Sequence, residues 1–174
     1  MDATRERETN VLTNGATVER TSERELVVTR TVNGPPRIVF DAWTKPELLQ
    51  QWWSPKSFPI TLLSVETDVR VGGRYRLVFG YEGSTFDFFG RYLEVTPPSR
   101  LAWTNDEGGE GGQVTRVTFE EVDGKTRLVV HDLYPSKEAL DEAIASGSNG
   151  MDAMPESLAQ LDDLLVSLGA EGWS

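Results

Sequence analysis

The feature that most limits the fold is a run of short β-type segments between residues 60 and 133, joined by very short links. These segments alternate β-branched or aromatic residues with polar ones, which is the pattern of strands with one buried face. Links this short cannot hold a parallel crossover, so consecutive strands must pair antiparallel. Asp123 and Gly124 give the strongest two-residue hairpin signal. The six predicted strands are 60–67, 73–80, 85–95, 100–105, 113–121 and 126–132.

A seventh predicted strand, over residues 26–32, precedes two short helices. Ile38, Ala42 and Trp43 share one face of the first helix, and Leu49 and Trp52 share one face of the second. A further short helix follows the last strand. The final helix carries an apolar stripe that must be buried, and the inner face of the sheet is the broad apolar surface available to it. The stripe consists of Leu158, Leu161, Leu164, Leu165 and Leu168.

This order of elements predicts an α+β fold, in which a curved seven-stranded antiparallel sheet wraps round the long C-terminal helix. A twisted sheet that curls round one helix rarely closes tightly at both ends, so we expect an apolar cavity between sheet and helix. One domain is predicted over residues 24–169, followed by a short tail at 170–174. Residues 1–23 are predicted to be a flexible tail, with at most a short edge strand around 16–20, because ten of the first 25 residues are charged.

Composition narrows the range of partners. The formal charge is −11, which repels nucleic acid. The chain has no cysteine and one histidine, so a cofactor or metal site is not expected. The N-terminal sequence lacks the order of a signal peptide, and no stretch has the apolar length of a membrane span. We therefore expect a cytoplasmic protein without a membrane span.

Several motifs in sequence order carry a resemblance to a known family. They are VFDAWTKPELLQQWW at 39–53, GGRYR at 72–76, GRY at 90–92 with the later PP and RL pairs, VTF at 117–119 and TRL at 126–128. Together they make residues 24–168 resemble the homologues of the heat-shock-protein-90 ATPase activator, a branch of the START / Bet v 1-like (SRPBCC) superfamily. The resemblance implies the helix-grip fold described above. Its members include co-chaperone domains, polyketide cyclases and aromatases, and lipid carriers, and they share no universal catalytic set.

The candidate site is an inward-facing set of aromatic and methionine side chains. Because strand side chains alternate between faces, Asp132 should point inward with Leu128 and Val130, whereas His131 points outward. Many relatives in the resembled family have a histidine where this chain has Asp132. Rigid aromatic rings beside flexible methionines suit an adaptable apolar pocket. The candidate ligand-binding residues are Trp53, Tyr75, Phe79, Phe88, Tyr92, Trp103, Phe119, Asp132, Met151 and Met154.

Three hypotheses about function follow. The first is non-enzymatic binding of a small hydrophobic or aromatic ligand in the cavity, and it names no catalytic residue. The second, from the resemblance, is a protein-interaction domain that binds a chaperone of the heat-shock-protein-90 type. The third is an enzyme of the polyketide cyclase or aromatase kind, which would need a proton-transferring group such as Asp132 inside the pocket.

Overall fold

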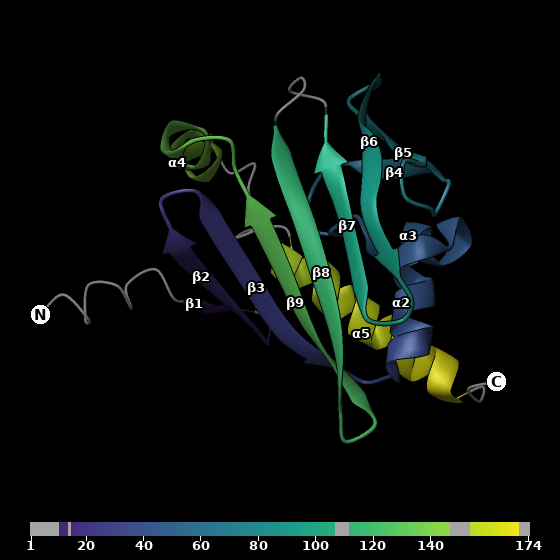
Figure 1. The fold of residues 1–174 in the computed structure, drawn as a ribbon. Helices are drawn as coiled ribbons and strands as arrows, with labels where there is room; N and C mark the ends of the chain where they lie inside the picture. Colours follow the sequence, from purple (N-terminus) through teal and green to yellow (C-terminus); the bar gives the residue numbers. More distant parts are fainter. Residues whose placement is uncertain (1–10, 14, 107–111, 147–153, 171–174) are drawn as a thin grey trace, which may run out of the picture.

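The computed structural model of the chain describes residues 11–13, 15–106, 112–146 and 154–170. Within these ranges, nine strands form one sheet in the order β1-β2-β3-β9-β8-β7-β6-β5-β4 (Figure 1). Every neighbouring pair is antiparallel, as the short links predicted. The strands are β1 (Val11–Thr13), β2 (Ala16–Ser22), β3 (Glu25–Val32), β4 (Thr61–Thr67), β5 (Arg74–Tyr81), β6 (Ser84–Thr96), β7 (Arg100–Asn105), β8 (Gln113–Val122) and β9 (Lys125–Leu133).

All seven predicted strands are present, and the sheet gains β1 and β2 at one edge. The predicted N-terminal tail is therefore too long: residues 11–13 and 16–22 are strands, and residues 1–10 lie outside the described part of the chain. Ala16 and Val18 are fully buried on one face of β2, while Glu19 is exposed on the other. The charged residues Glu19 and Arg20 make the segment look polar when its composition is averaged. They do not prevent burial of Ala16 and Val18, because alternate residues of a strand point to opposite faces.

Four helices complete the described part of the fold, and their positions agree with the predicted ones. They are α2 (Pro36–Thr44), α3 (Pro46–Trp52), α4 (Lys137–Ser146) and α5 (Met154–Ala170). None of the described helices has the length and apolarity to cross a membrane. Helix α5 lies behind the sheet in Figure 1 and packs against β2, β3 and α3. Leu158, Leu161 and Leu165 of its stripe are fully buried, so the predicted docking of this helix is confirmed.

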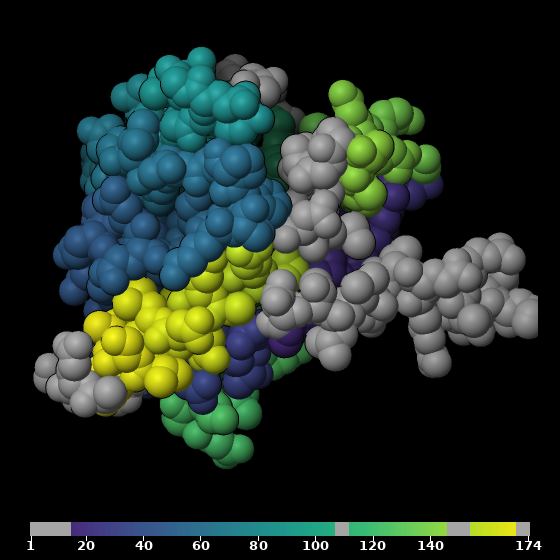
Figure 2. All heavy atoms as spheres, turned by 180° about the vertical axis from the view of Figure 1, so that it is seen from behind, coloured from purple at the N-terminus to yellow at the C-terminus, as the bar shows by residue number. Residues whose placement is uncertain are grey.

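Hydrogen bonds join α5 to the end of α3 and the segment after it. Gln160 donates from Nε2 to the carbonyl oxygens of Trp52 and Ser54, both at 2.9 Å, and Ser157 donates its hydroxyl to the carbonyl of Trp53 at 2.7 Å. Figure 2 shows α5 lying along this segment on the face behind the sheet. These hydrogen bonds hold Trp53, the residue after α3, in place. Its side chain faces the half of the sheet that α5 does not cover.

The sheet bends sharply where β6 leaves β5 and continues beside β7. Strand β6 pairs with β5 through Arg91 and with β7 from Tyr92 onward. Gly90 lies at the bend, where a Cβ atom would stand 1.9 Å from the carbonyl oxygen of Thr104. Only glycine permits this approach of the two backbones. The bend brings Tyr75, which is paired with Gly90, close to the end of β7.

Candidate functional site

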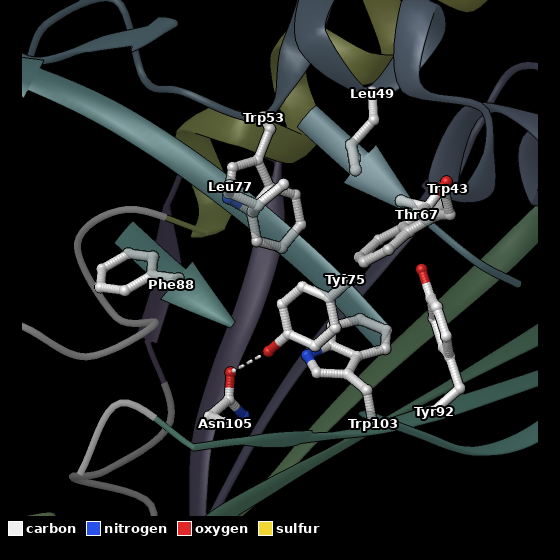
Figure 3. A pocket seen from close by; sticks show the side chains of 10 residues that line it. All are labelled: Trp43, Leu49, Trp53, Thr67, Tyr75, Leu77, Phe88, Tyr92, Trp103 and Asn105. Atoms are coloured by element: carbon white, nitrogen blue, oxygen red, sulfur yellow. Dashed lines mark hydrogen bonds between the residues drawn. The ribbon is translucent and has the colours of Figure 1, made fainter. Parts of the chain in front are cut away.

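A cavity lies between the two short helices and strands β4 to β7 (Figure 3). Its lining comes from α2, α3 and the residue after it, and from four strands. None of the lining residues belongs to α5, so this cavity does not lie at the expected position between the sheet and the C-terminal helix. On the sheet-facing side of α5, Leu158, Leu161 and Leu165 are fully buried. The lining residues are Trp43, Leu49, Trp53, Thr67, Tyr75, Leu77, Phe88, Tyr92, Trp103 and Asn105.

The cavity is small. The space open to the centre of a water-sized sphere is about 50 Å³. If this space is treated as a sphere and extended by the water radius of about 1.4 Å, it holds a molecule of about 200 Å³. Pockets for drug-sized ligands begin at roughly 300 Å³. The cavity therefore has room for about one ring, and the partly exposed side chain of Phe88 stands at its rim.

Aromatic rings in contact with one another make the walls rigid. Trp43 is at the centre of this cluster and is 2% exposed. Its ring centroid lies 5.7 Å from that of Trp53 and 5.9 Å from that of Trp103. On the sheet side, the ring of Tyr75 lies 5.9 Å from Tyr92 and 6.3 Å from Trp103. Edge and tilted contacts of this kind are the preferred geometries of aromatic pairs, so the walls are preorganised.

Five of the ten predicted site residues line this cavity. They are Trp53, Tyr75, Phe88, Tyr92 and Trp103.

The other predicted residues lie elsewhere. Phe79 is buried in the core beside Phe88, with ring centroids 5.3 Å apart, and Phe119 packs behind Trp43 at 6.1 Å. Met154, at the start of α5, is partly buried against the core and is not part of the lining. Met151 lies outside the described residues. Phe79 and Phe119 were placed correctly on inward faces, but most side chains on an inward face pack in the core rather than against a cavity.

The lining also contains five residues that the sequence reasoning did not select. Trp43 and Leu49 were recognised as lying on apolar helix faces, which predicted burial but not contact with a cavity. Asn105 stands at the end of a strand, where a polar residue is ordinary. No local signal distinguishes it. The five residues are Trp43, Leu49, Thr67, Leu77 and Asn105.

Asp132 and His131 point to opposite faces, as the strand alternation predicted. His131 Nε2 lies 2.6 Å from Glu25 Oε2 on the outer face. The pKa of Glu25 is lowered, first by a hydrogen bond from Ser22 and then by His131. Asp132 is buried, and loss of hydration raises the pKa of its carboxyl group above the ordinary value. Asp132 does not line the cavity.

A chain of hydrogen bonds nevertheless connects Asp132 with the cavity wall. Thr115 donates its hydroxyl to Asp132 Oδ1 at 2.6 Å, and Asn105 Nδ2 donates to Thr115 Oγ1 at 3.0 Å. The hydroxyl of Tyr75 lies 3.3 Å from Asn105 Oδ1, shown as the dashed line in Figure 3, and 2.7 Å from the carbonyl oxygen of Thr104. The polar end of the cavity is therefore ordered by groups buried behind it.

The ten lining side chains contain no acid and no base of the Asp, Glu, His, Lys or Arg type. The hydroxyl of Tyr92 points toward Trp43 and Thr67 in Figure 3, and burial raises the pKa of this phenol, so it stays neutral. In the described part of the chain, no group of three His, Cys, Asp or Glu residues could hold a metal ion. The arrangement suits a neutral guest.

A wider depression lies on the opposite face of β4, β5 and β6, with a volume of about 820 Å³. Three arginines and three acids line it. Arg76 Nε lies 2.8 Å from Asp87 Oδ2, and Arg91 Nε lies 3.8 Å from Asp106 Oδ2. Exposed ion pairs of this kind contribute little energy. This face is a solvated surface, and the cavity is the better candidate site.

The family model of the Activator of Hsp90 ATPase homolog 1-like proteins matches residues 33–165. The chain belongs to this family. The predicted family and its helix-grip fold are thus confirmed. No curated protein matches the chain.

Solved structures share the fold of this chain. The chain is similar to a protein from Rhodobacter sphaeroides, with 26% identity and a TM-score of 0.77 over 88% of this chain and 99% of that one. A protein from Nitrosomonas europaea has 24% identity and a TM-score of 0.75, over 87% and 99% of the two chains. An AHSA1-like protein from Aeromonas hydrophila has 19% identity and a TM-score of 0.67, over 86% and 97%.

Proposed function

We propose that the protein binds one small, neutral and mostly apolar molecule, about the size of one ring, in the cavity beneath α2 and α3. The observation that carries the proposal is the lining itself, which combines a preorganised aromatic wall with a polar end at Tyr75 and Asn105 and no charged side chain. A cavity of this kind favours an apolar guest because little protein surface has to lose water or become ordered when the guest enters.

The size of the cavity limits the affinity. An aromatic ring that buries about 150 Å² gains about 4 kcal/mol at 25 cal/mol per Å², which corresponds to a Kd near 1 mM. A hydrogen bond at the polar end adds to this. Simple one-ring compounds should therefore bind in the millimolar to high-micromolar range.

The test is a titration with toluene and phenol, followed by the indole N–H resonances in two-dimensional NMR spectra. Three tryptophans line the cavity, so their resonances should shift with saturation, and the melting temperature should rise. Leu77→Phe should abolish both effects because the larger ring occupies the cavity. Leu93→Phe, the same change at an exposed position of β6, should leave them intact. If neither compound shifts an indole resonance of the wild type, the proposal is wrong.

A protein-binding role is the second candidate, and a specific surface favours it. Phe86 and Phe88, near the β5–β6 turn, are each 39% exposed. Their ring centroids lie 5.4 and 5.3 Å from that of Phe79 and 5.7 Å from each other, so they form a fixed apolar patch. The family description names activation of the Hsp90 ATPase.

This second candidate predicts that the protein binds a chaperone of that type and changes its ATPase rate. Phe86→Ser should weaken the effect, while Val122→Ser, at an exposed apolar residue of the β8–β9 hairpin, should not. A full ATPase effect in the Phe86 variant would exclude the patch as the contact.

We do not extend the proposal to a cyclase or aromatase. Acid–base catalysis needs a proton donor or acceptor within hydrogen-bond reach of the substrate. Asp132 is separated from the cavity by Thr115 and Asn105. The tyrosines at the wall are poor proton donors near neutral pH, and burial raises the pKa of Tyr92 further.

A further inference from the structure

The hydrogen bonds of Asn105 determine what the polar end of the cavity can offer a guest. A side-chain amide has two N–H donors and one oxygen acceptor. Both donors of Asn105 point away from the cavity into the sheet, since Nδ2 lies 3.0 Å from Thr115 Oγ1 and 3.4 Å from the carbonyl oxygen of Gln113. Figure 3 shows the amide oxygen on the side of Tyr75 and the nitrogen turned away.

The opposite orientation of the amide is disfavoured by its neighbours. Turning it over would place Asn105 Oδ1 against the carbonyl oxygen of Gln113, so that two acceptors would face each other. Thr115 has one hydroxyl hydrogen, and it donates this hydrogen to Asp132 Oδ1 at 2.6 Å. Thr115 can therefore only accept a hydrogen bond from Asn105. A buried hydrogen bond to a carboxyl group is among the stronger ones, so Asp132 holds this arrangement.

We infer that the guest carries a hydrogen-bond donor, such as a phenolic hydroxyl or a ring N–H, and that Asn105 Oδ1 receives it. In this reading Thr115 and Asp132 are positioning residues, which act through Asn105 and do not touch the guest. An ether or ketone whose oxygen is directed at Asn105 Oδ1 would place one acceptor against another. A carboxylate would do the same and would meet no positive side chain in the lining.

This inference rests on the proposed function, and the experiment separates the two. Toluene, phenol and anisole are titrated into the wild type, Asn105→Leu and Thr115→Val. Thr118→Val serves as the matched control, because Thr118 lies on β8 but on its exposed face. The quantity measured is the ratio of phenol affinity to toluene affinity in each protein. Comparing this ratio between a variant and the wild type removes the difference in hydrophobicity between the two compounds and any effect on the cavity that both compounds share.

The phenol-to-toluene ratio should fall in Asn105→Leu by between about threefold and tenfold, the value of one hydrogen bond. Thr115→Val should lower the ratio as well, and Thr118→Val should not. The anisole-to-toluene ratio should not fall in any variant. The wild type alone should bind phenol more tightly than anisole, which tests the inference even if a variant does not fold.

Two results would overturn the inference while leaving ligand binding intact. One is a wild type that binds anisole at least as tightly as phenol. The other is a phenol-to-toluene ratio that is unchanged in Asn105→Leu. Binding of none of the three compounds to the wild type would instead overturn the proposed function.

Discussion

Replacing Gly90 by alanine tests the backbone contact on which the cavity depends. The new Cβ would lie 1.9 Å from the carbonyl oxygen of Thr104 and 2.9 Å from its hydroxyl, and the closer contact is to backbone, which cannot rotate away. Strands β6 and β7 must therefore separate by about 1 Å. Overpacking of this kind costs about 1–3 kcal/mol.

The separation also weakens two hydrogen bonds across the bend. The Arg91 amide donates to Thr104 Oγ1 at 3.0 Å, and the Asp106 amide donates to the carbonyl of Phe89 at 2.8 Å. At about 1 kcal/mol each, their loss brings the expected destabilisation to about 3–5 kcal/mol. For a chain of this size, the melting temperature should fall by at least about 6 °C.

The assay is urea and thermal unfolding followed by circular dichroism. Gly80→Ala is the control, because the same substitution on β5 meets only the Cδ1 end of the exposed Leu63 side chain at 3.2 Å. Gly80→Ala should lower the free energy of unfolding by less than about 1 kcal/mol. Gly90→Ala should also weaken toluene binding, because the displaced strand β7 carries Trp103 and Asn105 of the cavity lining. Equal stability of the two variants would refute the reasoning.

Two further predictions concern burial. Burial raises the pKa of Asp132 in the folded state above the ordinary value of 3.8. Between these two pKa values the folded state holds a proton that the unfolded state has released. The free energy of unfolding therefore falls as the pH rises from 3.8 through the raised pKa. The Asp132→Asn variant cannot ionise at this position and should lack this fall. The measurement is the free energy of unfolding from urea titrations between about pH 3 and 8. Parallel pH profiles for the wild type and the variant would contradict a raised pKa for Asp132. Leu161→Ala, at a fully buried position of α5, should cost about 2–5 kcal/mol in denaturant unfolding, whereas Val166→Ala, at an exposed position of the same helix, should cost less than about 1 kcal/mol.

The strands and helices were predictable because each has a periodic pattern that is local in the sequence. The alternation that placed Asp132 inward and His131 outward is of this kind, and the structure agrees with it. Strand β2 was underestimated for a related reason. Averaging over its charged residues concealed Ala16 and Val18, which are fully buried at alternate positions.

The position of the cavity was not predictable in the same way. An apolar stripe shows that α5 is buried, but not which half of a nine-stranded sheet it covers. Helix α5 packs on β2 and β3, the shorter α2 packs on β8 and β9, and α3 packs on β4. The gap remains where these helices end, beside Trp43 and Trp53. This depends on how the elements cross, which the pattern of one element does not contain.

Asn105 shows why a polar binding residue is harder to predict from the sequence than the aromatic residues of a cavity lining. An asparagine at a strand end is ordinary, and its chemistry here depends on Gln113 and Thr115 across the β7–β8 pair. Those two residues accept the hydrogen bonds of both amide N–H groups. Asp132 on the next strand accepts the hydroxyl hydrogen of Thr115 and so holds Thr115 in place. Three neighbouring strands thus convert a group that could donate or accept into one that only accepts. The selectivity of such a cavity is set by residues that never contact the guest, so relatives with the same aromatic wall but a different residue at the position of Thr115 or Asp132 should prefer different guests.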